Sequence, residues 1–405
     1  MEASSYDIVV VGGGIIGLAT AMLLIERYPR NRVAVLEKEE AIAEHQTGHN
    51  SGVIHAGLYY TPGSQKANLC WTGGESLRRF CDDHDVKYEM CGKVVVATRE
   101  SQLDGLEELR RRGEANGVIG LEVVGKERLR ELEPHAAGLK ALHSPNTGIV
   151  DYTAVARAFA AELRHRGGDL VTGTTVREVR TDGAGQRVET SNGDVGARYV
   201  INCAGLYADR LARSMGAETD VRIVPFRGEF FSLKAERAGL VNGLIYPVPD
   251  PKLPFLGVHF TRRIDGSVEA GPNAVLALAR EGYRKTDVDV RELLGIAAFP
   301  GFWRMGATHW KTAVKEVYRS MLKGEFARSL QTLVPEVRVD DLTNPSAGVR
   351  AQAVSRKGEL LQDFSIVRTP GAVHVLNAPS PAATACIAIG RHIVDLAAEA
   401  FELQA

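Results

Sequence analysis

A glycine motif close to the start of the chain is the feature that most constrains its fold. Tyr6 to Val11 is a short β-branched run, typical of a strand buried on both faces, and Ile15 to Tyr28 has the length and composition of a helix. Gly12, Gly14 and Gly17 have the spacing G-x-G-x-x-G where these segments meet. The first glycine allows a tight turn, the second lets the backbone approach a pyrophosphate, and the third permits close packing of helix on strand. The motif therefore predicts a dinucleotide site, with a purely structural turn as the alternative.

A carboxylate lies near the end of the next predicted strand. Arg32 to Lys38 is short and apolar, which completes the size of a βαβ unit, and it contains Glu37. We expect the Glu37 carboxylate to accept hydrogen bonds from a ribose hydroxyl, which favours an adenosine 2′-OH over a 2′-phosphate. The N-terminus of the first helix faces the phosphates. Ile15, Ile16 and Lys38 are accordingly placed in the cofactor site.

Composition excludes several classes of function. Lys plus Arg is 49 and Asp plus Glu is 50, so the net charge of -1 gives no field to attract nucleic acid. The five cysteines form no C-x-x-C pair, which disfavours a disulfide framework and a zinc site, and we expect no metal. The uncharged run from Ile8 to Ile25 is interrupted by three glycines and preceded by Glu2 and Asp7, which argues against a signal peptide or membrane span. We expect a cytoplasmic protein, and contact with the inner face of the cell membrane stays open.

Two kinds of secondary-structure pattern occur along the 405 residues, a length that suits about two domains. Segments of the parallel α/β type occur at both ends, whereas after Arg222 short strands separated by Pro, Gly and Asp turns indicate an antiparallel sheet. We predict an α/β fold in which a Rossmann-like domain is interrupted by an inserted α+β substrate domain. The nucleotide-binding domain comprises residues 1–88, 150–222 and 345–405, and the substrate domain comprises residues 89–149 and 223–344.

A polar, glycine-rich stretch, Ala41 to Gly63, is too long for an idle connection. The run Thr47 to Tyr60 within this stretch resembles the region under the isoalloxazine ring in flavoproteins of the D-amino-acid oxidase superfamily. Val200 to Asp209 is similar to the second pyrophosphate-side motif of that superfamily, although a plain strand-to-helix turn at Gly205 is an alternative. The resemblance implies FAD rather than NAD, on a glutathione-reductase-like domain. It places in the FAD site Asn50, Ser51, Gly52, Val176, Ala204 and Gly205.

Further motifs narrow the resemblance to the L-2-hydroxyglutarate dehydrogenase (oxidase) family and spread it over almost the whole chain. They are Asn50 to Gly57, Lys66 to Cys70, Cys91 to Lys93, Phe255 to Thr261, Gly271 to Ala274 and Gly348 to Gln352. The resemblance implies FAD-dependent oxidation of L-2-hydroxyglutarate to 2-oxoglutarate, by hydride transfer from C2 to flavin N5. Oxygen or a membrane quinone would then take the electrons. An amine or amino-acid oxidase of the glycine or sarcosine type, and a partner protein that holds FAD structurally, are the alternatives.

Two histidines are candidates for the catalytic base. Oxidation of an alcohol needs a base for the hydroxyl proton, and the pKa range of histidine suits that role. For His55, in the segment similar to the flavin loop, three roles stay open: base or substrate contact, covalent attachment of flavin, and a hydrogen bond to flavin or loop. His259, on a predicted strand, either faces the substrate and shares or takes over the base role, as the resemblance implies, or is a core residue.

The resemblance also implies a carboxylate clamp. Arg350 follows Gly348 and Val349 and resembles the G-x-R arginine that binds the substrate carboxylate in amino-acid oxidases of this fold. A guanidinium holds a carboxylate in a bidentate manner that lysine does not reproduce, although an ordinary surface ion pair is the alternative. A dicarboxylate needs a second anchor. The candidates are Tyr60, Tyr246, Thr261 and Ser380, together with Arg227 and Lys357.

Two segments depart from a simple pattern. Where relatives usually have a glycine-rich turn beside flavin N1 and O2, Asn377 to Thr384 contains two prolines, so the identity of the donating amides stays open. We place Pro381, Ala382 and Ala383 beside the flavin. Aromatic and cationic residues also occur together in Phe299 to Met305 and at Trp310 and Lys311. Docking on a membrane surface is one interpretation, and packing inward or against a second subunit in a homo-oligomer is the other.

Overall fold

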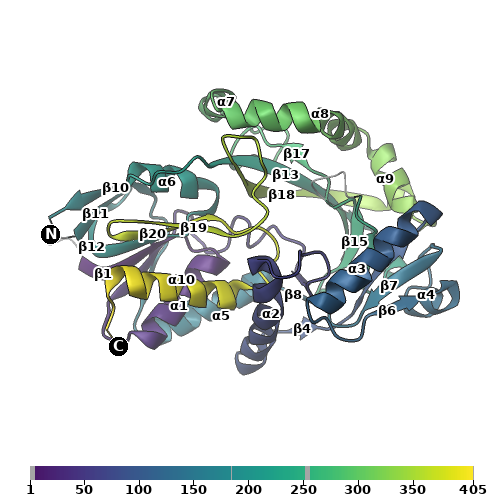
Figure 1. Ribbon diagram of the computed structural model, residues 1–405, viewed down its shortest axis with the longest axis horizontal. Coiled ribbons are helices and arrows are strands. Elements are labelled where there is room, and N and C mark those ends of the chain that lie inside the picture. Colours follow the sequence, from purple (N-terminus) through teal and green to yellow (C-terminus); the bar gives the residue numbers. More distant parts are fainter. Residues whose placement is uncertain (1–4, 184, 251–255, 405) are drawn as a thin grey trace.

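The computed structural model describes residues 5–183, 185–250 and 256–404. Figure 1 shows a sheet with helices below it on the left, a second sheet on the right, and the helices α7 and α8 along the top. The predicted strand from Phe255 begins outside the described residues, and within them the strand extends over His259–Arg262 as β15. The described residues form two large sheets with helices against them, as the predicted α/β fold requires.

The first sheet is built around parallel strands in the order β9, β2, β1, β12 and β20. These are β1 (Ser5–Val11), β2 (Val33–Leu36), β9 (Asp169–Val171), β12 (Gly193–Asn202) and β20 (Ala372–Asn377). Antiparallel strands extend it, namely β10 (Val176–Asp182), β11 (Gly185–Thr190) and β19 (Ser365–Thr369). Segments from both ends of the chain therefore share one sheet.

The sequence of β1 explains why this sheet is covered on both faces. Ile8 and Val10 belong to the core cluster that contains Leu18, whereas Val9 belongs to the opposite cluster with Val188. Successive side chains of a strand point to opposite faces, so an uninterrupted apolar run needs cover on each side. Four helices contribute to the larger core: α1 (Ile15–Arg27), α2 (Gln65–Asp83), α5 (Tyr152–His165) and α10 (Cys386–Phe401). Each buried Leu, Ile or Val side chain contributes about 1.5–3 kcal/mol.

The second sheet has the order β17, β13, β16, β15, β14, β5, β7 and β6, with β18 paired to β13. Its pairs are antiparallel, as the sequence predicted, except that β14 and β5 run parallel. The strands are β5 (Lys93–Ala97), β6 (Glu122–Val124), β7 (Lys140–Ser144), β13 (Arg222–Leu233), β14 (Leu244–Pro247), β15 (His259–Arg262), β16 (Val268–Gly271), β17 (Val275–Leu276) and β18 (Leu342–Val354). Strand β18 crosses residue 345 and pairs with β13 from end to end, and the division into domains stays a prediction.

The remaining elements connect and cover the two sheets. A small third sheet consists of β3 (Val53–Ile54), β8 (Gly148–Val150) and β4 (Tyr88–Glu89). The other helices are α3 (Leu103–Ala115), α4 (Lys126–Leu132), α6 (Ala208–Ser214), α7 (Val290–Ala297), α8 (Pro300–Met321) and α9 (Lys323–Gln331), with 3-10 turns at Glu100–Gln102, Gly205–Tyr207, Ala235–Leu240 and Val339–Asp341. Among the helices that the structure describes, none combines the length and the apolar character that a bilayer span requires.

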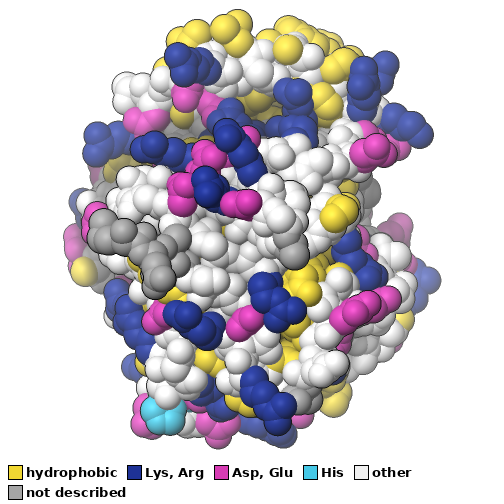
Figure 2. Space-filling model, turned by 90° about the vertical axis from the view of Figure 1, so that its left-hand side faces the viewer, with side chains coloured by type: hydrophobic (Ala, Val, Ile, Leu, Met, Phe, Trp, Pro, Cys, Tyr) yellow, Lys and Arg dark blue, Asp and Glu magenta, His cyan; other side chains and the backbone are white. Residues whose placement is uncertain are grey.

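The aromatic segment at the top of the molecule is divided between core and surface. Phe299 and Met305 are buried, whereas Trp303 and Trp310 are 63% and 57% exposed. Figure 2 shows hydrophobic side chains along the top edge of the molecule, where α7 and α8 lie in Figure 1. The expected packing toward the interior is therefore found for Phe299 and Met305 but not for Trp303 and Trp310.

Candidate active site

A cavity of about 1190 Å³ extends from the glycine motif to the predicted catalytic residues. Most of the predicted site residues line it: His55, His259, Arg350, Tyr60, Tyr246, Ser380, Gly12, Gly14, Ile15, Ile16, Gly17, Glu37, Lys38, Asn50, Ser51, Val176, Ala204, Gly205, Pro381, Ala382 and Ala383. Gly52 and Thr261 do not line it. The structure therefore brings together, from distant parts of the chain, nearly all the residues selected from the sequence.

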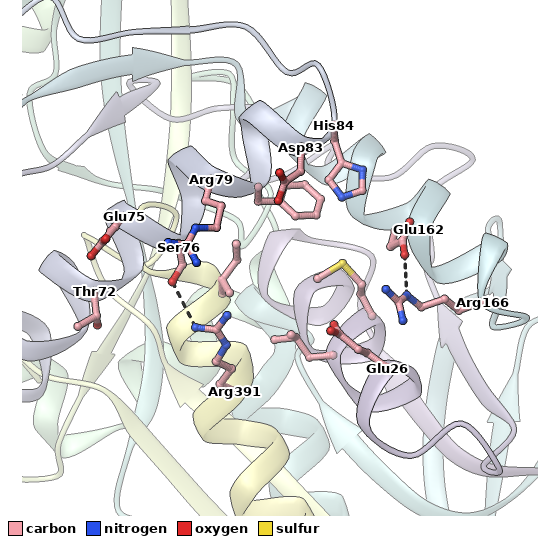
Figure 3. A pocket seen from close by; sticks show the side chains of 14 residues that line it. Glu26, Thr72, Glu75, Ser76, Arg79, Asp83, His84, Glu162, Arg166 and Arg391 are labelled. Atoms are coloured by element: carbon pink, nitrogen blue, oxygen red, sulfur yellow. Dashed lines mark hydrogen bonds and ion pairs between the residues drawn. The ribbon is translucent and has the colours of Figure 1, made fainter.

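A second, smaller cavity of about 440 Å³ lies among α1, α2, α5 and α10 and contains none of the predicted site residues (Figure 3). Its polar side chains bond to one another, as in the pair Arg166 and Glu162 at 2.6 Å and the pair Arg391 and Ser76 at 3.2 Å. Most of these polar groups belong to helix surfaces that face solvent. The larger cavity is therefore the candidate active site.

Steric demands explain the glycines at one end of the large cavity. Gly12 has a φ of +110°, and a Cβ there would lie 2.5 Å from the carbonyl oxygen of Cys203. A Cβ at Gly17 would lie 2.0 Å from the Gly12 oxygen. At Gly14, by contrast, the nearest atom would be Thr47 Oγ1 at 3.5 Å. Gly12 and Gly17 thus allow β1, α1 and β12 to meet, and Gly14 leaves an open approach for a pyrophosphate.

The Glu37 carboxylate is held by backbone amides at the end of β2. Its Oε2 accepts from the Gly13 N–H at 2.6 Å, and its Oε1 accepts from the Glu39 N–H at 3.0 Å. Each carboxylate oxygen has a second lone pair, so both can still accept from ribose hydroxyls. The neighbouring Lys38 ammonium pairs with Glu39 and, at 2.7 Å, with Glu281.

A possible cation site lies beside this ammonium. Ligand atoms of Glu39, His45 and Glu281 lie within 4.8 Å of one another. The Lys38 ammonium already supplies positive charge to both of these carboxylates. The expectation that the protein holds no metal stays a prediction.

The loop before β3 is shaped by Asn50 and Gly52. Asn50 donates to the Thr47 carbonyl at 2.6 Å and accepts from the Gly52 N–H at 2.8 Å, which closes a side-chain turn. Gly52 has a φ of +69°, and a Cβ there would lie 2.9 Å from the Val150 oxygen. The structure thus places Gly52 behind the loop, where it lets β3 pair with β8, rather than on the cavity wall.

His55 follows β3 and is held on both sides of its backbone. Its N–H donates to Thr384 Oγ1 at 3.1 Å, and its carbonyl accepts from Cys70 Sγ at 3.3 Å. The imidazole Nε2 lies 3.5 Å from Ser380 Oγ. Burial, with smaller contributions from Lys93 and His259, holds the pKa of His55 well below its usual value, so the ring is neutral at physiological pH.

His259 is fixed as a neutral tautomer. Its Nδ1 lies 2.8 Å from the Gly257 carbonyl oxygen, which only accepts, so Nδ1 carries the hydrogen and Nε2 is left as an acceptor. Burial is the main cause that lowers the pKa of His259 to about 3. Its ring stacks on Tyr246 with centroids 3.8 Å apart. This arrangement is what a general base requires: an unprotonated nitrogen in a defined orientation.

Thr261 supports this stack from outside the cavity. Its hydroxyl forms a hydrogen bond with Tyr246, and its own side chain is buried in β15. His259 and Thr261 lie two positions apart on β15, so their side chains are on the same face of the strand. Thr261 thus contacts Tyr246 and does not line the cavity, and its expected contact with a substrate stays a prediction.

Arg350 enters the cavity from β18, opposite Phe226 of β13. Gly228 makes room for it, since a Cβ at that position would lie 3.3 Å from Arg350 Nη2. Burial lowers the pKa of Arg350 to about 10, which leaves the guanidinium charged at neutral pH. A cation in the wall of a cavity suits a bound carboxylate better than it suits the alternative of a surface ion pair.

The structure also separates the candidates for a second anchor. Tyr60 and Ser380 share a hydrogen bond at the cavity wall. Arg227 is committed elsewhere, because it donates to Glu229 at 3.1 Å and to the Arg284 carbonyl at 3.0 Å. Lys357 is exposed and does not line the cavity.

Sequence analysis missed two lysines and a threonine. Lys66 lines the cavity, and Lys93 is 2% exposed with its Nζ 4.2 Å from the centroid of the Tyr246 ring. Both occur within motifs that carried the family resemblance, which was the available signal. Thr384 accepts from the His55 N–H, lies 3.0 Å from the Tyr152 hydroxyl and donates to the Val53 carbonyl. It thereby joins the turn at residues 377–384 to the loop that carries His55.

The fold and the cavity define an FAD-dependent oxidoreductase. The model of the family described as FAD dependent oxidoreductase matches residues 7–396, and the chain belongs to this family. Among solved structures it is similar to the FAD-bound L-alpha-glycerophosphate oxidase from Mycoplasma pneumoniae, with a TM-score of 0.79, 24% identity, and coverage of 97% of this chain and 94% of that one. It is also similar to glycine oxidase from Geobacillus kaustophilus, with a TM-score of 0.72, 20% identity, and coverage of 98% and 95%. These likenesses concern the fold alone.

Sequence relatives identify the branch: the chain belongs to the L-2-hydroxyglutarate dehydrogenase family. It is 48% identical to the L-2-hydroxyglutarate dehydrogenase of Indibacter alkaliphilus over 98% of this chain and 100% of that protein. Identity is 48% to the Escherichia coli K12 dehydrogenase, over 96% and 92%, and 43% to the human mitochondrial one, over 99% and 90%. The predictions of FAD and of this family are confirmed, whereas the roles of single site residues stay predictions.

Proposed function

We propose that this protein oxidises L-2-hydroxyglutarate to 2-oxoglutarate with FAD as the electron acceptor. The observation that carries the proposal is the meeting of Arg350 and two neutral histidines in the cavity that also contains the glycine motif. The L-2-hydroxyglutarate dehydrogenases that resemble the chain over nearly its whole length support the choice of substrate.

The residues at the cavity wall fit the FAD dinucleotide. The open approach at Gly14, the amide-held Glu37 and the turn at residues 377–384 would hold its pyrophosphate, ribose and flavin parts. A cavity of about 1190 Å³ has room for the cofactor and a small acid together. When bound, FAD supplies the acceptor for the hydride that leaves C2 of the substrate.

The protein's own groups bind the hydroxyacid and remove its proton. Arg350 binds the C1 carboxylate through two parallel N–H donors and thereby orients C2. His259 is our first candidate for the base, because its Nε2 is an acceptor and its ring is clamped between Gly257 and Tyr246. His55 is the second candidate, and its neutral ring meets the same requirement. The hydroxyl proton goes to one of these nitrogens as the carbonyl of 2-oxoglutarate forms.

An amine or amino-acid oxidase is the alternative, because an arginine clamp and a neutral base serve a C–N bond equally well. Anaerobic mixing of the FAD-loaded protein with L-2-hydroxyglutarate, glycine and sarcosine distinguishes the two functions. We expect loss of the oxidised flavin band with the hydroxyacid and none with the amines. Reduction by an amine alone would replace the proposal with the alternative.

We further infer that the electrons pass to a membrane quinone rather than to oxygen, with α7 and α8 in contact with lipid. Apolar side chains on these two helices face outward, including Leu294, Trp303, Trp310 and Met321, and the cations of Lys311 and Lys315 border them. Figure 2 shows this apolar edge at the top of the molecule. An apolar face bordered by cations suits an anionic bilayer surface.

Vesicle binding tests this docking. We expect the protein to co-sediment with vesicles that contain anionic lipid, and the double substitution Trp303→Ser, Trp310→Ser to abolish it with flavin reduction unchanged. A dimer that dissociates in the same variant, together with no vesicle binding by the wild type, would instead assign this face to a second copy of the chain.

A further inference from the structure

Lys66 occupies a position in the cavity wall that is unfavourable for a structural cation. It lies in the first turn of α2, where the positive end of the helix dipole opposes a positive side chain. It is only half-exposed, and burial lowers its pKa to about 8, which still leaves the ammonium largely protonated at neutral pH. The Nζ atom lies 5.9 Å from the centroid of the Tyr60 ring. Because burial and the helix dipole both disfavour a cation at this position, we look for a functional reason for Lys66.

No protein carboxylate binds the Lys66 ammonium within the described part of the chain. Asp363 is close enough to act on its charge, but the carboxylate oxygens of Asp363 accept from the backbone N–H groups of Gln65 and Lys66, each at 3.1 Å. Asp363 also accepts from the Phe364 N–H at 2.9 Å. These bonds orient Asp363 as a cap for α2 and leave the ammonium itself available to a ligand.

The charges around the cavity are divided between its two ends. The acidic wall residues are Glu37, Glu44 and Glu281, which belong to the nucleotide end beside β2 and His45. At the end that contains the histidines, the described wall residues include the cations Arg350 and Lys66 and no carboxylate. Arg350 comes from β18 and Lys66 from α2, so the two cations approach the cavity from separate elements.

We propose that Lys66 binds the second carboxylate of a dicarboxylic hydroxyacid while Arg350 binds the first, so that Lys66 determines the preference for a dicarboxylate. This assignment rests on the proposed function. The hydroxyls of Tyr60 and Ser380, which lie at the same part of the wall, supply neutral donors beside the ammonium. Lys93 is not the anchor, because it lies behind the rings of Tyr59 and Tyr246 and does not line the cavity.

The test compares two substrates that differ only in the second carboxylate. Flavin reduction is measured anaerobically with L-2-hydroxyglutarate and with L-2-hydroxypentanoate, in which a methyl group replaces that carboxylate. In Lys66→Met we expect kcat/KM to fall about 10- to 100-fold for the dicarboxylate, as for loss of a charge-assisted hydrogen bond, and less than about threefold for the monocarboxylate. Lys66→Arg restores most of the preference because it retains the charge.

Binding without turnover gives an independent readout. Glutarate and butyrate are titrated against the oxidised holoenzyme, and the change in the flavin spectrum reports occupancy. We expect Lys66→Met and Lys66→Gln, whose side chains are uncharged, to weaken the binding of glutarate and to leave the binding of butyrate unchanged. Lys357→Met, a substitution of an exposed lysine outside the cavity, serves as the matched control and leaves both unchanged.

The outcomes separate this inference from the proposed function. One outcome would overturn the assignment of Lys66 alone. In it, L-2-hydroxyglutarate reduces the wild-type flavin, and all three Lys66 variants keep the wild-type ratio of kcat/KM for the two substrates. Equal losses for both substrates in Lys66→Met and Lys66→Gln would also overturn it, because Lys66 would then act on the flavin or the fold. If neither hydroxyacid reduces the flavin of the wild-type protein, the proposed function and this assignment are both overturned.

Discussion

The two ends of the large cavity are built on different principles. The nucleotide end is made largely by glycines and backbone groups between Gly12 and Glu37, with Cys203 as the distant partner of Gly12, and Gly12 and Gly17 permit contacts that any side chain would block. The end that contains the histidines is assembled from four separate segments, which carry His55, His259, Arg350 and Ser380. Local sterics determine the first end, and long-range packing of two sheets determines the second. The two ends should therefore respond differently to substitution.

The largest effect is expected at the nucleotide end. In Gly17→Val, the new Cβ would lie 2.0 Å from the Gly12 oxygen, so the turn between β1 and α1 cannot keep its conformation. We expect nearly complete loss of bound FAD, measured as the flavin-to-protein ratio. Gly295→Ala, in a helix where a Cβ meets nothing within 4 Å, is the control and retains its flavin. A fully loaded Gly17→Val protein would contradict the steric account of this end.

Substitution of the proposed base, His259, should slow flavin reduction strongly and leave the cofactor bound. For His259→Ala we expect a fall of about 100-fold or more in the rate of flavin reduction, as for loss of a general base, with unchanged flavin content. His55→Ala should have the smaller effect of the two. The reverse order, with His259→Ala close to the wild type, would transfer the base role to His55.

The next largest effect is expected on kcat/KM when Arg350, the proposed carboxylate clamp, is replaced. Arg350→Lys retains a positive charge but loses the planar pair of donors, so we expect kcat/KM for the hydroxyacid to fall by about 100-fold. Flavin content should be that of the wild type, because Arg350 belongs to the substrate end. A change of less than about threefold would make the clamp untenable.

The smallest expected effect concerns the pH profile. Burial is the main reason that the histidines are neutral, and the charge of Lys93 lowers the pKa values of His55 and His259 further. Removing that cation in Lys93→Met raises both pKa values, so the acid limb of kcat/KM moves to higher pH, whereas Lys93→Arg keeps the wild-type profile. Identical profiles for Lys93→Met and the wild type, from titration of flavin reduction against pH, would show that Lys93 does not act on the base.

The same contrast explains how much the sequence could predict. The strand, turn and helix around Gly12, Gly14 and Gly17, and the carboxylate of Glu37, follow from local spacing, and the parallel sheet follows from uninterrupted apolar runs such as β1. The parallel pairing of β5 with β14 joins segments far apart in the chain and left no local signal.

Side-chain direction was the part that sequence patterns could not supply. Thr261 and Gly52 were expected in the site, but neither lines the cavity: Thr261 bonds Tyr246, and Gly52 belongs to the side-chain turn of Asn50. Lys66 entered the site because Asp363, almost three hundred positions away in the chain, caps the first turn of α2. Such contacts depend on how the two sheets pack together, which composition and periodicity do not specify.

The most direct test of the account is anaerobic mixing of the FAD-loaded protein with L-2-hydroxyglutarate, its D enantiomer and sarcosine, with the oxidised flavin band as the readout. The account predicts rapid loss of the band with the L hydroxyacid alone, since Arg350 and His259 present one face of C2 to the cofactor. An oxidised band that persists with the L hydroxyacid, or one that disappears with sarcosine alone, would contradict it.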